Sequence, residues 1–176
     1  NFNNKISLLK SLEEKPNKDW LKRISECEDE KVLKYFLKDK DFSNKEGNSS
    51  EELRLLWECC QIPDFVKKTY GNHLEVVTKV FDFLRNKNKK IPNSYMKEQL
   101  SLLDKLDGNV DSISNRIANV RTWAYVSNKS NWVENQDYWI ERTKFIEDKL
   151  SDRLHEELTK SFIDKRASVL ARGLKQ

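Results

Sequence analysis

The chain has 176 residues, of which 37% are hydrophobic and 35% are charged, and it holds only four glycines and three prolines. This balance favours helices with wide solvated faces and disfavours sheets, which need many turns. A net charge of +4 does not by itself indicate a nucleic-acid-binding protein, because what matters is where the cations gather. No run of about 18 apolar residues is present, so we expect neither a membrane span nor a signal peptide.

The N-terminal part of the chain predicts three short helices. They cover residues 2–15, 17–28 and 29–42, and Pro16 separates the first two. The polar stretch 40–50, which contains Gly47, predicts a loop. We therefore expect residues 1–48 to form a small N-terminal helical lobe or linker, and residues 49–176 to form the main domain.

The main domain predicts further helices joined by short loops. Ser49 and Glu52 form a capping box that opens the first of them, which carries apolar residues at helical spacing. Others are expected at residues 73–87, 94–106 and 111–128, and the last and longest runs from Asn135 or Asp137 to about Arg172. The expected fold class is all-α, an irregular multi-helix bundle with a long C-terminal helix.

The stretch "NRIANVRTWAYVSNKSNWV", residues 115–133, combines arginines with aromatic residues and has no acid. On a helix, Arg116 and Trp123 flank one side of an apolar stripe, and Arg121 and Tyr125 flank the other. One interpretation is that the aromatics widen the core while the arginines cover them. A second is that Arg116 or Arg121 contacts phosphate while Trp123 or Trp132 stacks on a base. A third is docking onto another protein.

The apolar residues of the last helix change their direction along its length. From Ile146 to Phe162 they recur every four residues, and each such step overshoots one turn by roughly 40°. The apolar stripe therefore drifts by more than a right angle between these two residues. The helix must bend, or it must meet different partners at its two ends.

Cations gather at two places. The end of the last helix carries Lys165, Arg166 and Arg172, which suit either the helix macrodipole or a phosphate-facing patch. The run "RNKNKKIP", residues 85–92, is interpreted as a solvated basic loop or a nucleic-acid contact.

No catalytic motif is present in the sequence. It lacks the phosphate loop GxxxxGK[ST] and the fingerprint GxGxxG, and "HEEL" at His155 lacks the second histidine of a zinc protease. The three cysteines form no CxxC pair and indicate reduced thiols in a cytoplasm-like compartment. The chain begins with Asn1 and its only methionine is Met96, so we expect part of a longer protein. The residues predict a non-enzymatic module with no catalytic residue, metal or cofactor of its own.

Three long stretches resemble one family. "LRLLWECCQIPDF" (53–65), "DGNVDSISNRIANVRTWAYVSNKSNWV" (107–133) and "RTKFIEDKLSDRLHEELTKSFIDKRASVL" (142–170) resemble the region beyond the motor in mitochondrial-degradosome-type RNA helicases and their bacterial relatives. The family positions that the resemblance carries over are Asn115, Arg116, Arg121, Thr122, Trp123, Arg142, His155, Asp164 and Arg166. Lys165 stands where relatives are expected to favour arginine, which would add bidentate geometry.

The resemblance implies a helical accessory part of a superfamily-two RNA helicase in the bacterial cytoplasm. ATP and Mg²⁺ would belong to the motor domains, on which this part would pack. The implied partners are single-stranded RNA, those motor domains and a 3′-to-5′ exoribonuclease. The expected RNA-contacting residues are Arg116, Arg121, Trp123, Trp132, Arg142, Lys165, Arg166 and Arg172. The alternative is a protein-docking module that binds the motor or an exoribonuclease without touching RNA.

Overall fold

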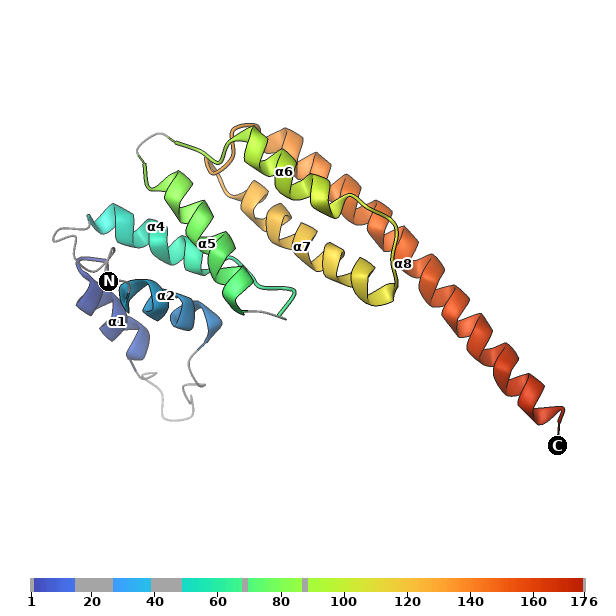
Figure 1. The fold of residues 1–176 in the computed structure, drawn as a ribbon. Helices are drawn as coiled ribbons and strands as arrows, with labels where there is room; N and C mark the ends of the chain where they lie inside the picture. The colour runs from blue at the N-terminus through green and yellow to red at the C-terminus, as the bar shows by residue number, and fades with distance from the viewer. Residues whose placement is uncertain (1, 15–26, 39–48, 68–69, 87–88, 176) are drawn as a thin grey trace. The chain divides into compact units, whose positions relative to one another are not determined.

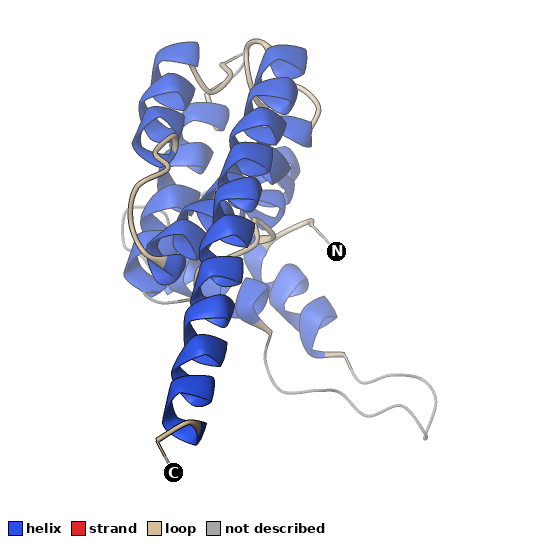
Figure 2. Cartoon of the chain, turned by 90° about the vertical axis from the view of Figure 1, so that its right-hand side faces the viewer, coloured by secondary structure: helices blue, strands red, loops and turns tan. Residues whose placement is uncertain are grey.

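The computed structural model describes residues 2–14, 27–38, 49–67, 70–86 and 89–175, and they form an all-α protein (Figures 1 and 2). The helices within these ranges are α1 (Lys5–Glu13), α2 (Glu28–Lys38), α4 (Ser50–Cys60), α5 (Tyr70–Leu84), α6 (Asn93–Leu103), α7 (Val110–Asn128) and α8 (Gln136–Gly173). In the described part of the chain, β geometry is limited to one isolated bridge between Ile91 and Val133. The predicted all-α fold with a long C-terminal helix is confirmed. Most of the helix expected over 17–28, and most of the expected loop 40–50, lies outside the described residues.

The contacts divide the chain into two compact units. Unit 1 consists of Asn1–Pro63 and Thr69–Lys89, and unit 2 consists of Asp64–Lys68 and Lys90–Gln176. Helices α4 and α5 therefore group with α1 and α2. The expected domain boundary between residues 48 and 49 lies at the edge of a segment outside the described residues. The contacts place the main boundary between the two units after residue 89.

In unit 1, α4 contacts both α2 and α5. The hydroxyl of Ser49 accepts a 3.2 Å hydrogen bond from the backbone N–H of Glu52, which confirms Ser49 as the predicted N-cap of α4. The carboxylate of Glu52, the other half of the predicted capping box, accepts a 3.1 Å hydrogen bond from Arg85. Leu56 and Phe81 are buried in the core between these helices. This arrangement follows from the helical spacing of their apolar side chains.

Unit 2 is built on the long contact between α7 and α8, which run antiparallel with α6 beside them (Figure 1). Ile113, Ile117 and Val120 line the buried side of α7, and Ile146 and Leu150 line that of α8. The apolar stripe of α7 recurs at steps of four and three residues, as a helix that packs along one side requires.

Helix α8 has different surroundings at its two ends. Its buried side chains, Trp139, Thr143, Ile146 and Leu150, all lie in the first half. Figure 1 shows α8 continuing past the start of α7, and every side chain from Phe162 to Lys175 is exposed. The drift of the apolar stripe predicted either a bend or different partners at the two ends, and the side of α8 that packs on α7 becomes polar after Leu154.

Candidate nucleic-acid interface

Arg116 holds the loop that precedes α7. Its guanidinium Nη1 donates to the carbonyl oxygens of Lys105, at 2.8 Å, and of Asp107. This loop passes through Gly108, whose φ of +109° is a conformation that side chains with a Cβ rarely adopt. The guanidinium of Arg116 therefore holds this loop in place. A phosphate would have to share the guanidinium N–H groups with the two loop carbonyls.

Arg121 joins α7 to α8 at the surface. Its Nε donates a 2.8 Å hydrogen bond to Oε1 of Glu147, and its side chain is 55% exposed. Ion pairs of this exposure contribute little to stability, because water already solvates both charges. Arg121 therefore lies where a phosphate could replace Glu147 as its partner.

The two tryptophans expected to stack on bases are buried. Trp123 is 3% exposed and packs edge-on against Tyr95, with ring centroids 5.8 Å apart. Trp132 is 5% exposed, and its carbonyl accepts a 2.7 Å hydrogen bond from the N–H of Ile91. Base stacking needs an open aromatic face, so this conformation favours the alternative interpretation, in which both rings enlarge the core.

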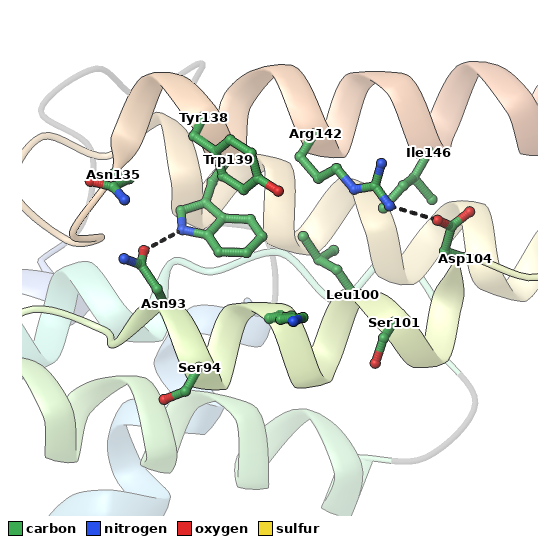
Figure 3. Close-up of a pocket in the computed structure, with 11 residues that line it drawn as sticks. Asn93, Ser94, Leu100, Ser101, Asp104, Asn135, Tyr138, Trp139, Arg142 and Ile146 are labelled. Carbon is green, nitrogen blue, oxygen red and sulfur yellow. Dashed lines mark hydrogen bonds and ion pairs between the residues drawn. The ribbon is translucent and has the colours of Figure 1, made fainter.

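Arg142 lies beside an open pocket between α6 and α8 (Figure 3). Its Nη2 donates a 2.8 Å hydrogen bond to Oδ2 of Asp104, and Nζ of Lys149 contacts the other oxygen of the same carboxylate. One acid therefore holds two cations of α8 in place. The side chain of Arg142 remains 38% exposed, so it still faces solvent at the mouth of the pocket.

Two exposed aromatic residues flank Arg142, and the sequence analysis missed both. Tyr138 is 56% exposed, and Phe145 is also exposed. The guanidinium of Arg142 lies 5.5 Å from the ring centroid of Phe145, and Nζ of Lys149 lies 4.9 Å from it. Tyr138, Arg142, Phe145 and Lys149 follow at steps of four and three, so they share one side of α8. This helical spacing is the signal in the sequence that predicts the cluster.

The second half of α8 carries the remaining predicted cations. Lys165, Arg166 and Arg172 are all exposed. Lys165 and Arg172 follow Leu154 by about three and five turns, so they continue the side that faces α7 earlier in the helix. Arg166 lies roughly a third of a turn away from that line.

The same half of α8 also exposes large apolar side chains. They are Leu158, Phe162, Ile163, Val169, Leu170 and Leu174. Arg166 lies one helical turn before Leu170, on the same side of the helix. This cation therefore lies among apolar neighbours. Several exposed apolar groups on one helix indicate a surface that contacts another molecule.

The comparisons found no family model, no curated protein and no solved structure that matches this chain. Within the described ranges, no three His, Cys, Asp or Glu side chains gather as a group that could hold a metal ion. None of the described helices combines the length and apolar character needed to cross a membrane.

Proposed function

We propose that this chain is a non-catalytic accessory module of an ATP-dependent RNA helicase. It would pack on the motor domains, which would bind ATP and Mg²⁺, and it would help to hold single-stranded RNA during unwinding or degradation in the bacterial cytoplasm. The resemblance of residues 53–65, 107–133 and 142–170 to the region beyond the motor of such helicases supports this proposal. A 3′-to-5′ exoribonuclease is a further candidate partner.

The observation that carries the proposal is the exposed second half of α8. It presents Lys165 and Arg172 along one side, where Lys165 lines a hollow with Asn109 and Asp111 at the start of α7. Leu170 lies about 160° around the helix from Arg172. The cationic side suits an RNA backbone, and the apolar side suits a protein surface. One helix could therefore touch the strand and the motor at the same time.

The physics of RNA favours a single strand as the ligand. The major groove of an A-form duplex is too narrow and deep for side chains to read. Cations and exposed aromatic rings can instead hold a single strand with little sequence preference. The modest net charge of +4 fits a module that shares the strand with another protein surface.

A titration of the full chain with a labelled oligouridylate at about 50 and about 200 mM salt tests the proposal. Each phosphate contact contributes roughly 0.7 to the slope of log affinity against log salt concentration for a single strand. Lys165→Ala combined with Arg172→Ala should therefore reduce this slope by about 1.4. The matched control, Lys10→Ala with Lys79→Ala, removes two exposed cations of unit 1 and should leave the slope unchanged. Undetectable binding at the lower salt concentration would overturn the proposal.

The second candidate function is protein docking without RNA contact, and the exposed apolar side of α8 favours it. A partner with an apolar groove and one carboxylate would cover Phe162 and Leu170 and would pair with Arg166. Such docking responds little to salt because most of its free energy comes from apolar burial. If RNA does not bind, and if Phe162→Asp abolishes association with the motor domains of the parent helicase, docking is the function.

A further inference from the structure

The pocket between α6 and α8 has the size and lining of a site for one nucleotide. Its volume is about 530 Å³, within the range usual for small-molecule sites. Trp139, Leu100 and Ile146 are buried and give it an apolar floor. Figure 3 shows Asn93 on α6 reaching toward Trp139 on α8, and Arg142 on α8 reaching toward Asp104.

The floor of the pocket is held rigidly. The indole Nε1 of Trp139 donates a 2.9 Å hydrogen bond to Oδ1 of Asn93, which fixes the ring across the two helices (Figure 3). The ring of Tyr138 packs edge-on against Trp139, with centroids 4.7 Å apart. This contact orients Tyr138, whose side chain stays more than half exposed. A preoriented aromatic ring loses little conformational entropy when a flat ligand stacks on it.

The charges around the pocket favour an anionic ligand. Its one acidic lining residue, Asp104, is already paired with Arg142 and Lys149. Lys97, on the opposite wall, is exposed. The pocket lining therefore carries two cations, Arg142 and Lys97, and one acid that is already paired. Such a lining favours a ligand with a negative charge.

We propose that this pocket binds one nucleotide of single-stranded RNA, with its base stacked on Tyr138 and its phosphate near Arg142 and Lys97. An aromatic ring beside cations is the combination that single-strand-binding surfaces use, because every base has a face that stacks. This inference rests on the proposed function and adds a specific subsite to it. The subsite is separate from Lys165 and Arg172, which were chosen above to test RNA binding itself.

The test uses the full chain and an oligoadenylate that carries a single 2-aminopurine, whose fluorescence falls when the base stacks. Tyr138→Ala should weaken binding by roughly 5- to 100-fold and remove the fluorescence change. Tyr138→Phe should preserve both, since it keeps the ring. Tyr35→Ala, which removes an exposed tyrosine from α2, is the matched control and should change neither. Circular dichroism checks that each variant is folded.

The outcomes separate the subsite from the proposed function. If the oligonucleotide binds with a steep salt dependence and Tyr138→Ala has no effect, the subsite is wrong and RNA binding stands. If the oligonucleotide does not bind, both fail. AMP alone should bind far more weakly than the oligonucleotide, because it lacks the neighbouring phosphate contacts. If AMP binds as tightly, the pocket serves a free nucleotide and its assignment to an RNA strand is overturned.

Discussion

The indole Nε1 of Trp139 donates a hydrogen bond to the side-chain oxygen of Asn93, and this bond joins two helices whose residues are 46 positions apart. A second polar link lies further along, where Arg142 and Lys149 of α8 meet Asp104, the residue that follows α6. Helices α6 and α8 are thus fixed at both ends of the pocket. A ligand that enters the pocket would meet walls that are already in place.

Trp139→Phe should destabilise the chain by about 1 kcal/mol, because it removes the hydrogen bond to the half-buried side chain of Asn93. Trp139→Phe combined with Asn93→Leu should cost less than the sum of the two single changes. Chemical denaturation measures all three variants. Additive costs would show that the hydrogen bond contributes nothing of its own.

Asp104→Asn should have opposite effects on stability and on RNA binding. The substitution removes the charge that pairs Arg142 with Lys149, so the two cations repel each other at partly exposed positions, at a cost of about 1 kcal/mol. The same change makes the pocket more cationic, so affinity for single-stranded RNA should rise at low salt. Denaturation and the oligonucleotide titration measure the two effects. A fall in RNA affinity, with the protein still folded, would contradict the assignment of the pocket.

The sequence predicted the packing of this protein better than its polar contacts. The apolar stripe of α7 and the drift of the apolar residues around α8 follow from helical spacing alone, and both are present in the structure. The cluster around Asp104 could not be predicted, because a loop residue after α6 meets side chains 38 and 45 positions later. The sequence also could not predict whether the ring of Trp123 is buried or exposed. An aromatic at the edge of an apolar stripe is buried or open according to what lies above it, and here Tyr95 lies against it.

Gly108→Ala should destabilise unit 2 by more than about 1 kcal/mol. Gly108 has φ of +109°, and an added Cβ would lie 3.0 Å from Cβ of Ser112 and 3.4 Å from Nη2 of Arg116. The change would disturb the loop that Arg116 holds. Gly173→Ala is the control, since nothing lies within 4 Å of an added Cβ there. Thermal denaturation compares the two, and an equal effect would show that the loop tolerates another conformation.

The two halves of α8 should respond differently to loss of an apolar side chain. Ile146→Ala removes a fully buried side chain at the contact with α7 and should cost about 2–5 kcal/mol. Phe162→Ala removes a side chain that is 64% exposed and should change stability by no more than about 0.5 kcal/mol. Chemical denaturation measures both. A large cost for Phe162→Ala would mean that the second half of α8 packs on this chain in solution and is not available to a partner.

The three thiols should differ sharply in reactivity. Cys27 is exposed, whereas Cys59 and Cys60 are buried in unit 1. Burial raises the pKa of the Cys60 thiol, and the nearby charge of Asp29 adds to this rise, so the reactive thiolate is disfavoured. In the native protein, a disulfide reagent at pH 8 should therefore modify one thiol rapidly, and Cys27→Ser should abolish this phase. Denaturant should then expose the other two. Rapid modification of two or more thiols without denaturant would show that α4 is not held in the core of unit 1.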